Sequence, residues 1–137
     1  MLFRSAYQIV VTFANPVTFT SASITSGTGA VSSSSVSGSQ ITANLAGVAN
    51  AQRIVLTLSG VSDGRNSGTV TVPMAVLAGD TTGNGLVNSS DISQTQSQSG
   101  QGAMSDNFRE DVTVNGVINS SDVSLVQSQS GTALPPP

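Results

Sequence analysis

The chain has 137 residues, a length typical of one or two small domains. It has no His and no Cys, which excludes Ser-His-Asp and Cys-His nucleophile systems, disulfides and ordinary zinc sites, so we do not expect an enzyme. Only 8% of its residues are charged and the formal net charge is −3, which argues against nucleic-acid binding. The absence of any run of about 18 apolar residues also predicts that the chain does not span a membrane.

The N-terminal half alternates apolar and polar residues in short runs, which is the periodicity of β-strands. The runs predict strands over residues 7–13, 17–24, 31–36, 40–45, 53–58 and 69–77. The four serines at 32–35 leave a flexible loop open as an alternative to the third strand. Pro73 cannot donate to a ladder, so it belongs at a sheet edge or a bulge. The spacing predicts a mainly β half, a two-sheet sandwich over residues 1–78.

This half also resembles bacterial surface immunoglobulin-like modules, on the stretches VVTFANPVT, ITANLAGVANAQRIVLTLSGVSDG and VTVPMAVLAGD. Such modules normally have a further strand before the VVTF strand, whereas only MLFRSA precedes the first run here. MLFRSA also lacks the apolar segment of a signal peptide. We therefore expect a fragment of a secreted or cell-surface protein, truncated at its first strand. The resulting open sheet edge predicts a homodimer or a strand exchange.

Charge separates the two halves of the chain. Residues 1–78 hold three Arg and one Asp, a net charge of +2, whereas residues 79–137 hold six acids and one Arg, a net charge of −5. Such asymmetry predicts two modules with different roles, and we place their boundary near Ala78 and Gly79.

The acidic half contains an internal duplication. Residues 80–100 (DTTGNGLVNSSDISQTQSQSG) and 111–131 (DVTVNGVINSSDVSLVQSQSG) are identical at 14 of 21 positions, at an offset of 31. Each repeat begins with a 12-residue loop of the EF-hand type, in which positions 1, 3, 5, 7, 9 and 12 supply oxygen ligands and position 6 is Gly. The pattern predicts two Ca²⁺ ions, held by Asp80, Thr82, Asn84, Leu86 and Asp91 in loop 1, and by Asp111, Thr113, Asn115, Val117 and Asp122 in loop 2.

The chemistry of each position fits this assignment. Asp at positions 1 and 12 gives charged oxygens, Thr and Asn give neutral ones, and position 7 uses its main-chain carbonyl. Val87 and Ile118, at position 8, are expected to point inward and pair the two loops, and Asn88 and Asn119 are expected to bind through a water. With only two carboxylates in each loop, the affinity is expected to be micromolar to millimolar. The competing interpretation is a plain Gly/Asn turn before a helix.

A loop followed by a helix, given twice, resembles a type I dockerin over residues 79–132. The resemblance implies a small α domain over residues 79–137, folding on calcium and attaching to a cohesin-like partner. It also implies that loop positions 10 and 11 select the partner, here Ser89, Ser90, Ser120 and Ser121. The following segments lack the basic residues usual in dockerins. This departure favours the alternative of a structural, calcium-stabilised module at the C-terminal end of a larger surface protein.

Three further residues of the acidic half have simpler interpretations. Phe108 is its only aromatic residue, and we expect it in the core. Asp106 and Glu110 flank it and could form the carboxylate pair of a glycosidase. Without an aromatic sugar platform beside them, they are expected to be solvated surface acids.

Overall fold

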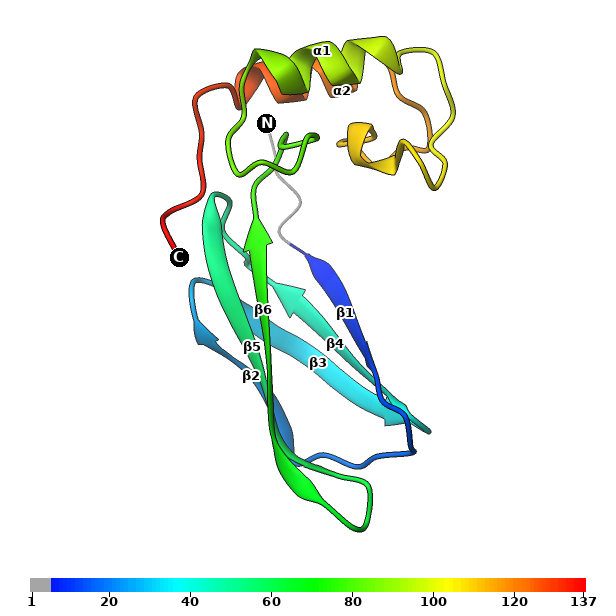
Figure 1. The fold of residues 1–137 in the computed structure, drawn as a ribbon, viewed down its shortest axis with the longest axis vertical. Helices are drawn as coiled ribbons and strands as arrows, with labels where there is room; N and C mark the ends of the chain where they lie inside the picture. The colour runs from blue at the N-terminus through cyan, green and yellow to red at the C-terminus, as the bar shows by residue number, and fades with distance from the viewer. Residues whose placement is uncertain (1–5) are drawn as a thin grey trace. The chain divides into compact units, whose positions relative to one another are not determined.

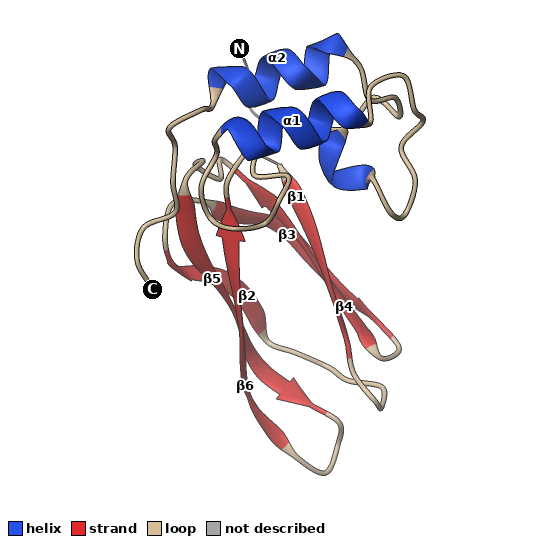
Figure 2. Ribbon diagram, turned by 45° about the horizontal axis from the view of Figure 1, so that its top comes forward, coloured by secondary structure: helices blue, strands red, loops and turns tan. Residues whose placement is uncertain are grey.

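The computed structural model describes residues 6–137, so the first five residues of MLFRSA lie outside the described part. The chain divides into two compact units, with the boundary between Val76 and Leu77. In the described part, all strands belong to the first unit and all helices to the second, as Figures 1 and 2 show.

The first unit consists of two three-stranded antiparallel sheets, ordered β1-β4-β3 and β2-β5-β6. This arrangement confirms the expectation of a mainly β first half. The strands are β1 (Tyr7–Thr12), β2 (Ser21–Ser26), β3 (Ala30–Ser37), β4 (Gln40–Ala46), β5 (Gln52–Ser62) and β6 (Ser67–Val76).

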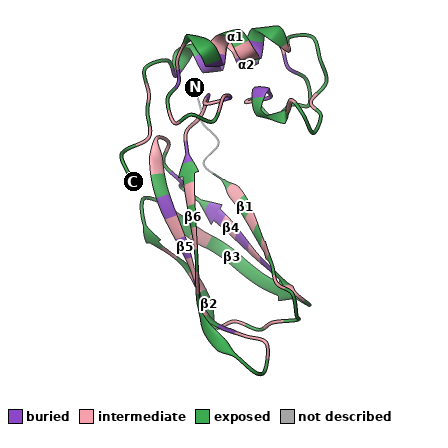
Figure 3. Ribbon diagram, in the orientation of Figure 1, coloured by how far each residue is buried: buried purple, intermediate pink, exposed green. Residues whose placement is uncertain are grey.

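The hydrophobic core lies between the two sheets and is supplied chiefly by their central strands, β4 and β5. Alternate residues of these strands are at most 2% exposed, among them Ile41, Leu45, Ile54 and Leu56. The inward residues of the outer strands β1, β2 and β6 are mostly only half-buried, because those strands have a neighbour on one side only. Figure 3 shows this pattern as buried segments along β4 and β5.

The second of the expected strands is shorter than predicted. It begins at Ser21 and not at residue 17, because β5 has an irregularity in register between Leu58 and Val61. Thr18 then pairs with Ser62 as an isolated bridge beyond the irregularity.

The serine-rich run at residues 32–35 is part of strand β3, as predicted, and the alternative of a flexible loop is wrong. Pro73 lies on the edge strand β6, as its chemistry required.

The second unit holds two α-helices, α1 (Ser89–Ser97) and α2 (Ser120–Ser128), and a short 3₁₀ helix, η1 (Phe108–Glu110). The two α-helices pack against each other. Val87 and Ile118, from the segments before the helices, are fully buried, as is Val126. None of the helices described in residues 6–137 combines the length and apolarity needed to cross a membrane.

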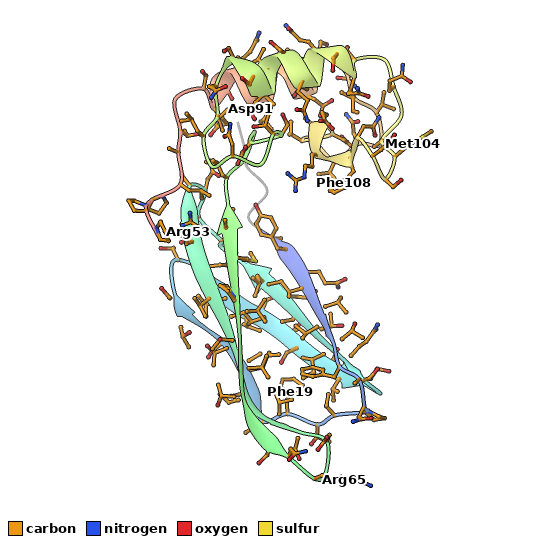
Figure 4. The ribbon with its side chains drawn as sticks, viewed as in Figure 1. Phe19, Arg53, Arg65, Asp91, Met104 and Phe108 are labelled. Atoms are coloured by element: carbon orange, nitrogen blue, oxygen red, sulfur yellow. The ribbon has the colours of Figure 1, made fainter. Side chains whose placement is uncertain are left out.

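Two expectations about η1 are wrong. Phe108 is 62% exposed and not part of the core, and Figure 4 shows its side chain on η1. Glu110 is not a solvated acid, since it is only 4% exposed and accepts a hydrogen bond from Gln94 of α1. The 3₁₀ turn places the two side chains on different sides, and Glu110 points inward, where it accepts the hydrogen bond from Gln94. Asp106 is exposed, as expected.

Candidate functional site

The first carboxylate of each repeat closes a tight loop through main-chain amides. Asp80 Oδ1 accepts from the N–H of Gly83 at 2.8 Å and of Asn84 at 3.0 Å, and its Oδ2 accepts from Gly85 N–H at 2.8 Å. The loop can turn this sharply because Gly83 and Gly85 have positive φ angles of 75° and 83°. The amides thus hold a half-buried carboxylate at the mouth of the loop.

The second loop repeats two of these three hydrogen bonds, while Val114 N–H donates to the main-chain carbonyl of Asp111 instead. Asp111 accepts from the N–H of Asn115 at 3.0 Å and of Gly116 at 2.8 Å, through the same two oxygens. Gly116 also has a positive φ, of 86°. The sequence duplication is therefore a duplication of hydrogen bonds as well.

The last carboxylate of each loop is fully buried at the start of the helix. Asp91 Oδ1 accepts from the N–H of Thr82 at 3.0 Å and from its hydroxyl at 2.9 Å, and Oδ2 accepts from Asn88 N–H at 2.8 Å. Burial raises the pKa of Asp91, but these hydrogen bonds outweigh it and leave the pKa below its usual value. Asp122 has the same contacts with Thr113 and Asn119. Figure 4 shows Asp91 at α1.

Asn88 and Asn119 have a structural role that the sequence analysis missed. Each is the N-cap of its helix, and its side-chain oxygen accepts from the N–H of Ser90 or Ser121 at 2.8 Å. The aspartate three residues later bonds back to the N-cap amide, which completes a capping box. The signal was present in the sequence as Asn-Ser-Ser-Asp before each helix.

The oxygens of positions 1, 3 and 12 converge in loop 1. Thr82 Oγ1 lies 2.9 Å from Asp91 Oδ1 and 3.4 Å from Asp80 Oδ1, so one hydroxyl links the two carboxylates. In loop 2 the Thr113 hydroxyl lies 2.8 Å from Asp122 Oδ1. Two carboxylates and a hydroxyl in one cluster form the hard-oxygen donor set that suits Ca²⁺.

The position-7 residues also suit their expected role. The main-chain carbonyls of Gly85 and Val87 accept bonds from the segment 131–134. Because successive carbonyls of an extended segment point in opposite directions, we expect that of Leu86 to point away from this pairing. Val117 lies in the same way between Gly116 and Ile118, whose carbonyls accept from the segment 100–103.

The position-5 amide oxygens of Asn84 and Asn115 accept from the N–H of Leu86 and Val117, at 2.9 Å in each loop.

The two loops are connected differently from the expectation. Val87 and Ile118 point inward, as predicted, but their main chains do not pair with each other. Val87 N–H donates to Thr132, after α2, and Ile118 N–H donates to Gln101, after α1, each at 2.9 Å. Each loop is therefore held by the segment that follows the helix of the other repeat.

The four serines of the expected partner surface, at positions 10 and 11 of the loops, are all exposed. They form the first residues of the two helices, which places one pair at the start of each: Ser89, Ser90, Ser120 and Ser121. The arrangement leaves both pairs accessible to a partner.

Each loop brings two carboxylates together, and within residues 6–137 no group of three or more His, Cys, Asp or Glu side chains that could hold a metal is found. Comparisons with protein-family models, with curated proteins and with solved structures gave no match to this chain. The residues of the two loops are therefore the basis for inferring a function.

Proposed function

We propose that the chain is a non-catalytic calcium-binding module of a secreted or surface bacterial protein. In this proposal, residues 1–78 are an immunoglobulin-like sandwich and residues 79–137 a dockerin-like domain with two Ca²⁺ sites. The observation that carries it is the convergence of Asp80, Thr82 and Asp91 around one hydroxyl in loop 1. In loop 2 the Thr113 hydroxyl makes the matching contact with Asp122.

The charge of the loops supports a divalent cation of modest affinity. Two carboxylates per loop would balance one Ca²⁺, while threonine and asparagine add only neutral oxygens. Because Asp91 and Asp122 also complete the capping boxes of the two helices, metal binding would stabilise α1 and α2 along with the loops.

Thermal unfolding tests the calcium site. We expect millimolar calcium to raise the midpoint of the helical circular-dichroism signal relative to EDTA, and Asp80→Asn to reduce this shift. Asp106→Asn is the matched control, because it removes the same charge from an exposed acid outside the loops. If the wild-type midpoint is the same in calcium and in EDTA, the proposal fails.

The proposed role of the domain is attachment to a cohesin-like partner through the exposed serine pairs. Because the two repeats have the same local geometry, either pair would present the same surface. A structural role without a cohesin partner is the second candidate, favoured by the absence of basic residues from α1 and α2.

A pull-down on immobilised cohesins, with calcium or EDTA, discriminates the two roles. For attachment, we expect calcium-dependent capture that survives Ser89→Ala/Ser90→Ala or Ser120→Ala/Ser121→Ala alone and is lost when both pairs are changed. Calcium-dependent stabilisation without capture by any cohesin supports the structural role.

The first unit supports a second copy of the chain as a further partner, through the outer edge of β1 over residues 8–12. Among the four outer strands, β2 and β3 carry register irregularities and β6 carries Pro73. These features hinder the addition of another strand. By contrast, β1 has no charged residue and no Pro, pairs with β4 in unbroken register, and is the outer strand of its sheet among residues 6–137.

The sequence of β1 is complementary to itself in an antiparallel pair centred on Val10. Such a pair would set Ile9 opposite Val11 on the half-buried inner face and Gln8 opposite Thr12 on the outer face. Val10, which is 49% exposed, would meet its own copy. The interface would be isologous, as in most symmetric dimers.

Sedimentation equilibrium of the whole chain tests this pairing. We expect a reversible dimer that Val10→Lys abolishes, because two like charges would then face each other. Val36→Lys is the matched control, since Val36 is a similarly exposed valine, on β3. A strict monomer at high concentration, or equal effects of the two substitutions, argues against the β1 interface.

A further inference from the structure

Each loop contains an Asn-Gly pair at positions 5 and 6, and this pair has its own chemistry. Asn84-Gly85 and Asn115-Gly116 lie at the turns of the loops, and both asparagines are exposed to solvent. In an Asn-Gly pair the glycine has no side chain to hinder attack of its main-chain nitrogen on the asparagine side-chain carbonyl carbon. Such pairs are therefore prone to spontaneous deamidation.

In both loops the attacking nitrogen is engaged elsewhere. Gly85 N–H donates to Asp80 Oδ2 and Gly116 N–H donates to Asp111 Oδ2, each at 2.8 Å. The asparagine oxygen is also occupied, because it accepts from the N–H two residues later at 2.9 Å. Attack requires the glycine nitrogen to leave the carboxylate and turn towards the asparagine Cγ.

We propose that Asn84 and Asn115 are latent deamidation sites, and that the carboxylates of Asp80 and Asp111 hold them unreactive. We call each Asp–Gly hydrogen bond a latch. When a latch opens, the glycine nitrogen loses its proton to solvent and bonds to Cγ. The Cγ–N bond of the side-chain amide breaks, and its NH2 group takes up a proton from solvent and leaves as ammonia. Water then adds to one carbonyl of the cyclic imide, which opens to aspartate or isoaspartate.

The two products would affect the loop in opposite ways. Aspartate adds a third carboxylate at position 5, where a calcium ligand is expected, and would strengthen binding. Isoaspartate inserts a methylene group into the main chain and disturbs the turn. These consequences rest on the proposed function, whereas the latch itself requires no metal.

The internal repeat provides the control for the experiment. Peptide mapping by mass spectrometry follows deamidation of Asn84 and Asn115 separately during incubation of the whole chain in EDTA. In Asp80→Ala we expect Asn84 to deamidate about tenfold faster than in wild type, the ratio expected for loss of a hydrogen bond to a charged group. Asn115 in the same molecule should keep its wild-type rate, and Asp111→Ala should reverse the pattern.

The unfolded wild-type chain in urea gives the rate without a latch. Equal rates in the folded and unfolded wild type would overturn the proposal. An unchanged or slower rate of Asn84 deamidation in Asp80→Ala would also overturn the proposal. A slower rate would mean that the carboxylate promotes the attack. If both asparagines of Asp80→Ala deamidate at the rate found in urea, that substitution has unfolded the unit. The milder variant Asp80→Asn then tests whether the carboxylate protects Asn84. That milder variant should accelerate Asn84 alone, and acceleration of neither asparagine or of both overturns the proposal.

Discussion

The main-chain N–H of Val87 donates a 2.9 Å hydrogen bond to the carbonyl of Thr132, and the N–H of Ile118 makes the same bond to Gln101. Both relationships join a loop to the segment after the other repeat's helix. Neither loop is therefore complete without the second repeat. This exchange explains why two short helices with few apolar residues can form one compact unit.

The segment after α2 is expected to stabilise loop 1 through its main chain. Leu134 N–H donates to the carbonyl of Gly85 at 2.9 Å, and Leu134→Pro removes this donor. We expect a loss of about 1 kcal/mol, seen as a lower urea midpoint of the helical circular-dichroism signal. Leu134→Ala keeps the N–H and separates the effect of the side chain. A proline variant no less stable than the alanine variant would show that this bond contributes nothing.

Exchanging residues between the repeats tests the buried polar cluster at η1. Gln94 of α1 corresponds to Leu125 of α2, and it donates to Glu110. The other carboxylate oxygen of Glu110, Oε2, is buried and has no hydrogen-bond partner among residues 6–137. Gln94→Leu removes the partner of Oε1 as well, so we expect a loss of about 1–3 kcal/mol in urea unfolding.

The neighbouring position gives the matched comparison. Thr95 is fully buried, and its hydroxyl donates to the carbonyl of Asp91 within α1, while its counterpart in α2 is Val126. Thr95→Val is expected to change the stability by less than about 1 kcal/mol, because the carbonyl of Asp91 also accepts from Thr81. If Thr95→Val lost as much stability as Gln94→Leu, the hydrogen bond to Glu110 would have no special contribution to stability.

Val114 is held in a strained main-chain conformation. Its φ is +56°, a value that β-branched residues rarely adopt, and its counterpart in loop 1 is Gly83, at +75°. Asn tolerates this region, and Val114 is 54% exposed, so Val114→Asn loses little burial. We expect a gain of about 1 kcal/mol in the free energy of unfolding, measured in urea.

The same substitution in loop 1 is the counter-test. A Cβ on Gly83 would meet only the guanidinium at the flexible end of Arg109, which can move aside. Gly83→Asn is still expected to destabilise the unit, because glycine adopts a φ of +75° more readily than asparagine does. Equal responses of the two loops would show that main-chain strain at Val114 is unimportant.

Acid is expected to weaken the turn between β5 and β6. The N–H groups of Asn66 and Arg65 donate to Asp63 and lower the pKa of its carboxyl below the ordinary value. A lowered pKa means that the contribution of Asp63 to stability is complete above about pH 4 and is lost as the pH falls through the folded-state value. The stability difference between wild type and Asp63→Ala should therefore shrink on acidification, and a difference that grows would contradict this sign.

The sequence predicted most of the first unit because alternation in β4 and β5 reflects burial directly. It placed the second strand too early, since residues 17–24 alternate well and nothing in the pattern reveals the irregularity of β5 near Gly60. In the second unit, the repeat predicted where the loops and helices lie.

The arrangement of the second unit was harder to predict. The pairing of Val87 with Thr132 and of Ile118 with Gln101 joins segments distant in the chain, and no local pattern indicates such contacts. Phe108 was misplaced because an aromatic residue usually has apolar neighbours to pack against, whereas η1 turns Glu110 inward. The capping boxes were a local signal that could have been recognised.

Equilibrium dialysis of the whole chain against calcium counts the metal ions that the two loops hold. We expect two bound calcium ions per chain at saturation, and one when Asp91→Asn or Asp122→Asn removes a buried carboxylate of a single loop. Saturation without bound calcium, or an unchanged count of two in both variants, would contradict the proposed calcium sites.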